Sequence, residues 1–320
     1  MARDDEIVVP LTDEAFGRGA ARAAVASAPT PVPPAPVAQQ QDACAPGAAP
    51  VRGSREVAID LRRLVAMGMV NPVMPHSQIA EEFRLIKRPL LRNVTATGPA
   101  AISRSNLIMV TSALPGEGKS FTAINLAMSI AMEFDYTVLL VDADVARPSV
   151  LNRLGLRRER GLMDMLSGET KDLSDVLLRT NIDKLTILPA GMPHARATEM
   201  LAADAMSKLL EQIASRYSDR IVIFDSPPLL VTTESRVLAA QMGQVVVVVE
   251  AEATTHGAIR QALTTIESCP VKMLVLNKSR GEVRSGSYYG YGYGYGKRSK
   301  SSKNSKSSAH KGKSGSQRAS

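Results

Sequence analysis

The sequence predicts an α/β fold with a doubly wound, mainly parallel sheet, and three observations lead to this class. Short apolar runs alternate with helical patterns over much of the chain. Several of these runs are unbroken stretches of Val, Ile and Leu, as expected for strands that helices cover on both faces. One run leads into a glycine-bearing loop that ends in Gly-Lys-Ser and precedes a helical pattern. Ligands of such sheets bind at the carboxyl ends of the strands.

The chain begins with a segment that we expect to be disordered. Residues 1–54 are rich in Ala and Pro, as in the run from Ala26 to Pro36. Such a composition cannot bury enough apolar surface to offset the entropy lost on ordering. Residues 55–98 are different, because apolar residues recur there at helical spacing. The first of two helical patterns stops at Asn71-Pro72, and the second covers Ser77 to Leu91 with Ser77 as the N-cap.

Strand and helix candidates alternate within residues 99–283, which we interpret as one nucleotide-binding domain. The strand candidates are Leu107–Thr111, Thr137–Asp142, Leu185–Leu188, Arg220–Asp225, Val245–Glu250 and Met273–Asn277. The intervening helical patterns cover residues 120–133, 199–216, 233–241 and 256–267. Residues 284–320 return to low complexity and are predicted to be a disordered tail.

The loop Ala113-Leu-Pro-Gly-Glu-Gly-Lys119-Ser120 lies between a predicted strand and a predicted helix, which is the context of a phosphate-binding loop. Its backbone N–H groups and the helix N-terminus favour phosphate oxygens. Lys119 is expected to reach the terminal phosphates and Ser120 to bind Mg²⁺. Ala113 stands where the general pattern has Gly. We therefore predict ATP binding by the following residues: Pro115, Gly116, Glu117, Gly118, Lys119, Ser120 and Phe121.

Three aspartates follow apolar strand candidates, and their side chains are expected at the carboxyl edge of the sheet beside the loop. Asp142 and Asp144 follow one strand and Asp225 ends another. Phosphoryl transfer needs carboxylates that hold Mg²⁺ and a group that orients the nucleophile. Asp225, Asp142 and Ser120 are the metal candidates, and Lys119, Asp142 and Asp144 are the catalytic candidates. The alternative for each aspartate is a turn or helix cap. The sequence leaves the division of roles between Asp142 and Asp144 open.

The net charge of +8 comes from the end of the chain. Residues 297–320 contain eight Lys or Arg and no acid, so the residues before them sum to zero (8 − 8 = 0). This tail suggests an anionic partner, phospholipid or nucleic acid, and the alternative is a solubilising tail. Cys44 and Cys269 form no disulfide framework. No apolar run approaches the ~20 residues of a membrane span, so we expect a soluble, cytoplasmic protein.

Taken together, three segments resemble the Walker-type motifs of the bacterial tyrosine kinase (BY-kinase) family. They are Ala113–Ser120, Val138-Leu-Leu-Val-Asp-Ala-Asp-Val-Ala-Arg-Pro148 and Ile221-Val-Ile-Phe-Asp-Ser-Pro-Pro228, and the resemblance covers about residues 55–283. It implies a P-loop NTPase fold of the deviant Walker (MinD-like) type. The family tolerates a small residue at the position of Ala113. One departure is that Ala146-Arg147 stands where the family usually has two basic residues. The stretch Glu81 to Leu91 is most similar to autokinases associated with exopolysaccharide and exosortase gene clusters.

The resemblance also implies contacts beyond the three motifs. Glu81, Arg84 and Lys87 resemble the family's oligomer-contact motif, with Lys in place of the final Arg, so residues 55–98 would be a helical oligomerisation segment. Asn277 is expected near the adenine. The implied cofactors are ATP and Mg²⁺. The implied partners are further copies in a ring, a membrane-bound polysaccharide co-polymerase as activator, and a phosphotyrosine phosphatase. These contacts would hold the chain at the inner face of the cell membrane, and nucleic acid is not an expected partner.

A tyrosine cluster near the end of the chain supplies candidate acceptors: Tyr288, Tyr289, Tyr291, Tyr293 and Tyr295. Glycines between the tyrosines remove steric obstruction to an active site. Each added phosphate carries about −1.5 to −2 charges, so five could cancel or reverse the adjacent basic charge. In the family this cluster is the autophosphorylation site, modified in trans. The alternative is a low-complexity segment that phase-separates or stacks on single-stranded nucleic acid.

These observations predict an ATP-dependent protein-tyrosine autokinase that acts in exopolysaccharide synthesis or export. One alternative is a MinD/ParA-like ATPase that switches its oligomeric state on membrane or DNA. Such proteins carry an additional Lys early in the loop, where this chain has Leu114 and Pro115. Another alternative is a scaffold that binds nucleotide without turnover. Lipid- or DNA-stimulated ATP turnover without phosphotyrosine would favour the first, and salt-dependent binding of the tail to nucleic acid would favour the second.

Overall fold

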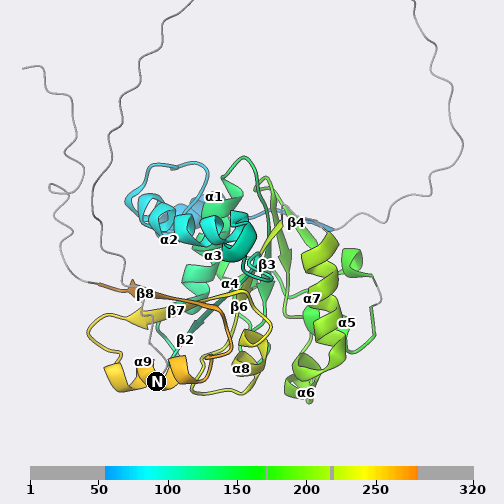
Figure 1. Cartoon of the computed structure of the whole chain (residues 1–320). Helices are drawn as coiled ribbons and strands as arrows, with labels where there is room; N and C mark the ends of the chain where they lie inside the picture. Colours follow the sequence, from blue (N-terminus) through cyan, green and yellow to red (C-terminus); the bar gives the residue numbers. More distant parts are fainter. Residues whose placement is uncertain (1–54, 171, 217–219, 280–320) are drawn as a thin grey trace, which may run out of the picture. The chain divides into compact units, whose positions relative to one another are not determined.

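The computed structural model describes residues 55–170, 172–216 and 220–279 (Figure 1). The N-terminal Ala/Pro-rich segment, the five tail tyrosines and the basic tail lie outside the described residues. Within the described ranges, no helix combines the length and the apolar character needed to cross a bilayer.

The described residues form an eight-stranded sheet in the order β1-β4-β5-β3-β6-β2-β7-β8. All pairings are parallel except that of β4 with β5, so the predicted mainly parallel sheet is confirmed. The strands are β1 (Arg55–Val57), β2 (Leu107–Ser112), β3 (Thr137–Asp142), β4 (Leu178–Thr180), β5 (Leu185–Leu188), β6 (Arg220–Asp225), β7 (Gln244–Glu250) and β8 (Val271–Asn277).

Helices cover both faces of this sheet. One apolar core lies beneath α1 (Leu61–Ala66), α2 (Gln78–Thr95), α3 (Lys119–Ala131) and α4 (Val150–Arg153). The other lies beneath α5 (Leu162–Leu166), α6 (Ala197–Ala202), α7 (Asp204–Arg216), α8 (Glu234–Ala239) and α9 (His256–Thr264). Because successive strand residues point to opposite faces, Ile108 of β2 enters the first core and Met109 the second. Two short 3₁₀ turns, Gly98–Ala100 and Leu173–Asp175, complete the elements of the described ranges.

Two local features differ from the sequence prediction, and a third concerns the helices of residues 55–98. The edge strands β1 and β4 were not expected, because three residues are too few to show a period. The helical pattern at 199–216 divides into α6 and α7, since Ala203 between them is extended, with ψ 160°. The helices of residues 55–98 pack into the same core as α3, through Leu64, Phe83 and Leu90 among others.

Lys87 lies inside this packing and does not face outward. Its side chain is 4% exposed, and its ammonium forms a 2.8 Å ion pair with Glu133, just beyond α3. The same ammonium donates a 2.5 Å hydrogen bond to the carbonyl of Ser129. Burial lowers the pKa of Lys87, and the pair with Glu133 opposes that shift. Lys87 therefore joins α2 to α3 within one chain, whereas Glu81 and Arg84 pair with each other at the surface.

Replacing Lys87 with Ala is expected to lower the free energy of unfolding by about 1–3 kcal/mol, because the carbonyl of Ser129 loses its buried donor. The matched control is Arg88→Ala, which truncates an exposed neighbour on the same helix. Denaturant unfolding followed by circular dichroism measures both variants. Equal, small effects in the two variants would contradict the structural role of Lys87.

Candidate active site

The phosphate-binding loop connects β2 to α3, and its glycines adopt conformations that other residues avoid. Gly116 has φ +90° and Gly118, the N-cap of α3, has φ +103°. A Cβ atom built on Gly118 would lie 2.0 Å from Nδ2 of Asn277, whereas one on Gly116 would meet nothing within 4 Å. Gly118 is therefore required for two reasons, its backbone conformation and the close approach of Asn277.

Side chains from distant elements hold the loop in place through Glu117. This carboxylate is 2% exposed and accepts a 2.8 Å hydrogen bond from the amide of Leu114. The hydroxyl of Thr254, after β7, donates to its other oxygen. The side-chain amide of Asn277, at the end of β8, donates to the Glu117 carbonyl over 2.8 Å. Asn277, expected near the adenine, is thus placed against the phosphate loop.

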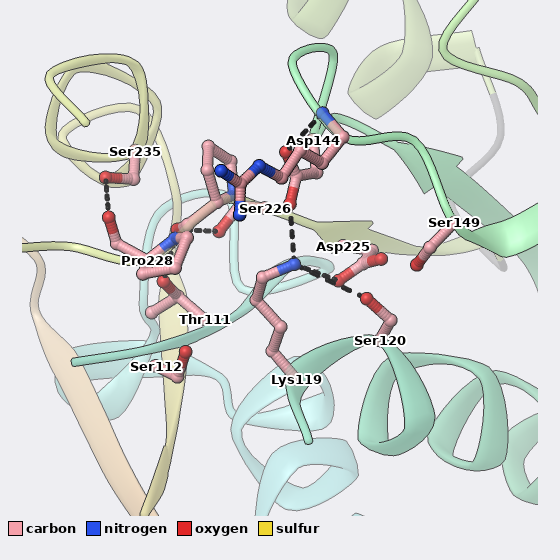
Figure 2. Close-up of polar contacts among 12 residues, drawn as sticks. Thr111, Ser112, Lys119, Ser120, Asp144, Ser149, Asp225, Ser226, Pro228 and Ser235 are labelled. Carbon is pink, nitrogen blue, oxygen red and sulfur yellow. Dashed lines mark hydrogen bonds and ion pairs between the residues drawn. The ribbon is translucent and has the colours of Figure 1, made fainter. Parts of the chain in front are cut away.

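Lys119 lies between two of the three predicted aspartates, as Figure 2 shows. Its ammonium is 2.6 Å from Oδ2 of Asp144 and 3.9 Å from Oδ1 of Asp225. The hydroxyl of Ser120 lies 3.4 Å away. The side chain of Lys119 is only 13% exposed, so these charges interact with little screening by water. The lysine, the serine and two of the aspartates thus meet at one point, as the strand pattern predicts.

Asp142 and Asp225 are register partners at the ends of β3 and β6. Both are buried, and both oxygens of Asp225 and Oδ1 of Asp142 lack hydrogen-bond partners. Burial raises the pKa of Asp142 to about 7, and the charge of Asp225 adds to this shift. Burial also raises the pKa of Asp225 to about 6, and the Lys119 ammonium and the nearby Ser120 hydroxyl oppose that rise. Two desolvated carboxylates with unused oxygens form a site suited to a cation.

The capping alternative is realised in part. Oδ2 of Asp142 accepts hydrogen bonds from the amides of Ser149 (3.1 Å) and Val150 (3.0 Å), where α4 begins. Oδ1 of Asp144 accepts a 3.1 Å hydrogen bond from the amide of Arg147. Each of these aspartates therefore orders the turn after β3 with one oxygen. The other oxygen differs, because that of Asp144 pairs with Lys119 and that of Asp142 remains unpartnered.

A cavity of about 260 Å³ lies beside Asp142. Its walls include Pro148 and Leu156, and also Pro189 and Gly191, which follow β5. The turn at Gly191 has φ +88° and packs close to the carboxylate of Asp164. That carboxylate accepts hydrogen bonds from the amides of Gly161 (2.7 Å) and Met192 (3.2 Å). The cavity wall is thus held by buried hydrogen bonds.

The loop after β6 is ordered by small polar side chains (Figure 2). The hydroxyl of Thr111 donates to the carbonyl of Pro227 over 2.9 Å, and that of Ser226 donates to the carbonyl of Val110 over 3.2 Å. Ser235 donates to the carbonyl of Pro228 over 3.4 Å. These hydrogen bonds connect β2, α8 and the Ser-Pro-Pro segment, and so hold Asp225 in position.

Three residues of the site were not predicted from the sequence. The hydroxyl of Ser149 is buried without a partner, and Figure 2 places it beside Asp225. Arg153 of α4 has a buried Nε without a partner, and its charge lowers the pKa of Asp225. Ser149 and Arg153 carry no sequence pattern. Thr254 follows the carboxyl end of β7, and that position is the one signal that could have identified it.

The residues fit a Mg²⁺ ion that binds together with a phosphate. In the described part of the chain, no group of three or more His, Cys, Asp or Glu side chains could hold a metal. Mg²⁺ does not require such a group, because it is usually bound by one or two carboxylates, substrate phosphates and water. The unpartnered oxygens of Asp225 and Asp142 and the nearby hydroxyl of Ser120 meet that requirement.

Known proteins are similar to this chain in sequence and in fold. Residues 105–278 match the family described as AAA domain. The tyrosine-protein kinase YwqD of Bacillus subtilis (strain 168) is 30% identical over 240 residues, which make up 75% of this chain and 93% of that protein. The tyrosine-protein kinase ptk of Acinetobacter johnsonii is 31% identical over 171 residues, 53% of this chain. The chain spans 23% of the length of that longer relative.

Solved structures agree with these matches. The chimerical protein CapA2B2 is 27% identical, with a TM-score of 0.58 over 71% of this chain and 94% of its own. The kinase domain of the Escherichia coli tyrosine kinase ETK, 24% identical, shares the fold with a TM-score of 0.59 over 76% of this chain and 94% of its own. The AAA-domain model matches more than half of this chain, and the chain covers almost the whole length of a 30% identical tyrosine-protein kinase. The chain therefore belongs to the bacterial tyrosine-protein kinases, with a P-loop in an AAA domain.

Proposed function

We propose that this chain is an ATP-dependent protein-tyrosine kinase whose acceptors are the tail tyrosines of a neighbouring copy. The observation that supports it is the pair of buried, incompletely bonded carboxylates, Asp142 and Asp225, beside Lys119 at the end of the phosphate loop. In this arrangement a positive charge and potential metal ligands lie together at the end of the phosphate loop, as phosphoryl transfer from ATP requires.

In the proposed reaction a tyrosine phenol is the nucleophile. A bond forms between the phenolic oxygen and the γ-phosphorus, the bond from that phosphorus to the β–γ bridging oxygen breaks, and ADP leaves. We assign the phenolic proton to Asp142, because its Oδ1 has no partner and the residue lines the adjacent cavity. Asp144 uses both oxygens on Lys119 and the Arg147 amide, so its role is to position the lysine.

The other residues bind and orient the nucleotide. We propose that Lys119 contacts the terminal phosphates and that Ser120 and Asp225 hold Mg²⁺. The metal, when bound, neutralises charge on the phosphate oxygens. Thr254 and Asn277 act through Glu117, which they hold in place. The buried positions of Lys119, Asp142 and Asp225 keep bulk water from screening these interactions.

The proposed cellular role is control of exopolysaccharide synthesis or export. It is supported by the resemblance of the α2 stretch to autokinases associated with those gene clusters. We propose a ring of copies, with Glu81 and Arg84 available at the surface for contacts between subunits. A membrane-bound co-polymerase would recruit the ring to the inner face of the membrane and activate it. A phosphotyrosine phosphatase would reverse the reaction.

Lys119→Met is expected to lower phosphotyrosine formation by at least about 100-fold, because a charge aimed at the transferred group is lost. The full chain is incubated with Mg-ATP, and phosphotyrosine is measured by blotting and by mass spectrometry of tail peptides. Chelating Mg²⁺ with EDTA should stop the wild-type reaction as well. Wild-type protein that forms no phosphotyrosine, even with its membrane activator added, would refute the proposed activity.

The same variant tests transfer between copies. Lys119→Met protein keeps its tail tyrosines and serves as the acceptor, and the enzyme is a chain with an intact site and Phe at all five tail tyrosines. Phosphotyrosine in the Lys119→Met protein is the expected result. If that mixture stays unmodified while wild-type protein modifies itself, transfer occurs within one chain.

A further inference from the structure

The last strand, β8, has an uncovered apolar edge. It lies at the end of the sheet, and among the described residues it pairs only with β7 (Figure 1). Alternate side chains of β8 are exposed, with Leu274 at 51% and Leu276 at 64%. Proteins usually cover or charge such an edge, because its free N–H and C=O groups and apolar side chains invite another strand.

The second wall beside this edge comes from α2. Leu85 is 64% exposed and lines, together with Leu274 and Leu276, a groove of about 550 Å³. Gln78 and Glu82 lie along the same wall. The groove therefore offers three exposed leucines, a strand edge and the carboxylate of Glu82, and the Lys278 ammonium at its end is paired with Glu250. These features suit an extended, partly apolar segment with nearby positive charge.

The tail of this chain has the pattern and the position that the groove requires. It begins directly after β8, at residue 280, and continues to residue 320. From Tyr289 to Tyr295 tyrosine and glycine alternate strictly, so an extended chain would place four tyrosines on one face. These seven residues match the seven residues of β8. The connection, residues 278–287, contains Gly281 and Gly286, which help the chain to reverse.

Charge points to the same occupant. Lys297, Arg298 and Lys300 follow the tyrosine segment, and Glu82 lies in the groove wall. Met273 and Val275 of β8 face the core beneath α2, so an added strand with its tyrosines beside Leu274 and Leu276 turns its glycines toward α2, where they need no room for side chains. Pairing with an existing edge supplies the backbone hydrogen bonds that a glycine-rich strand cannot obtain alone.

We propose that the unphosphorylated segment 288–295 docks in cis along β8 as an added edge strand, with the four alternating tyrosines, Tyr289 to Tyr295, on the face of Leu274 and Leu276. Docking would keep the acceptors away from the active site of the same chain until a neighbouring copy engages them. A phosphate adds about −1.5 to −2 charges, which cannot remain against leucines that the docked segment covers, so modification would release the tail. The docking of the tail does not depend on the proposed kinase activity, whereas its release by phosphorylation does.

Hydrogen exchange with mass spectrometry on the full-length Lys119→Met chain tests the docking, because this chain stays unphosphorylated. Peptides that cover residues 286–297 and 270–279 are expected to exchange about tenfold or more slowly than in the same chain carrying Leu274→Lys and Leu276→Lys. The control is Val231→Lys, a charge added at an equally exposed apolar residue (59%) away from β8, which should keep the protection. Melting curves verify that each variant is folded.

Three outcomes would overturn the proposal. The tail peptide could exchange equally fast in the parent and in the Leu274/Leu276 variant. Its protection could depend on protein concentration, which would assign the groove to the tail of another copy. The β8 peptide could be protected equally in both chains while the tail is not, which would assign its protection to the pairing with β7 alone. Wild-type protein treated with Mg-ATP tests release, and a lack of phosphotyrosine there would count against the kinase activity and leave the docking result intact.

Discussion

Asp225→Asn is expected to abolish most kinase activity while leaving the protein at least as stable as the wild type. Asp225 is completely buried, and neither of its oxygens has a hydrogen-bond partner. Its raised pKa means that the folded state disfavours the ionised carboxylate, so a neutral amide removes that penalty at pH 7.5. Lys119 is not left unpaired, because Asp144 stays 2.6 Å from its ammonium.

The expected loss of activity is about 100-fold or more, since an amide cannot replace a carboxylate in holding Mg²⁺ or balancing charge in the transition state. Phosphotyrosine formation and the melting temperature are measured on the same preparation. Asp183→Asn, at an exposed turn, is the control and should change neither. A large fall in melting temperature would contradict this account, because it would mean that Asp225 serves the fold. A trade of stability for function is common at active sites.

Gly118→Ala is expected to have the second large effect, a loss of nucleotide binding. Alanine at φ +103° costs about 1–2 kcal/mol from backbone strain alone. Its Cβ would also lie 2.0 Å from the Asn277 amide, so either the loop or the end of β8 must shift. Because the loop binds phosphate through backbone N–H groups, such a shift would reduce affinity directly.

Two further variants separate strain from the steric clash. Gly116→Ala carries a similar backbone cost, at φ +90°, with nothing within 4 Å of its Cβ, so it should weaken binding less. Asn277→Ala combined with Gly118→Ala removes the clash and should restore part of the affinity. Titration with a fluorescent ATP analogue in Mg²⁺ measures all of these variants. Equal losses for Gly116→Ala and Gly118→Ala, with no recovery in the double variant, would show that the approach of Asn277 is unimportant.

Local sequence patterns were sufficient to predict the parallel sheet and to predict that the main site residues lie close together. The predicted strands at Thr137–Asp142, Leu185–Leu188 and Arg220–Asp225 agree with the structure at both ends. This is possible because strand period and apolar runs are properties of neighbouring residues. The parallel arrangement then brings Asp142 and Asp225 to one edge, beside a loop recognisable from its glycines and lysine.

Contacts between residues far apart in the sequence could not be predicted from local patterns. Thr254 and Asn277 reach Glu117 across 137 and 160 residues, and no local pattern records either contact. The burial of Lys87 depends on how α2 packs against α3. The spacing of Glu81, Arg84 and Lys87 along the helix is equally compatible with an exposed lysine. The unpartnered oxygens of Asp142 and Asp225 likewise follow from packing around two adjacent strand ends. The residue types and their order thus determine which chemical groups the site contains. Burial and long-range packing determine which carboxylate oxygen or ammonium remains available for a ligand, because desolvation and hydrogen bonding depend on neighbours in three dimensions.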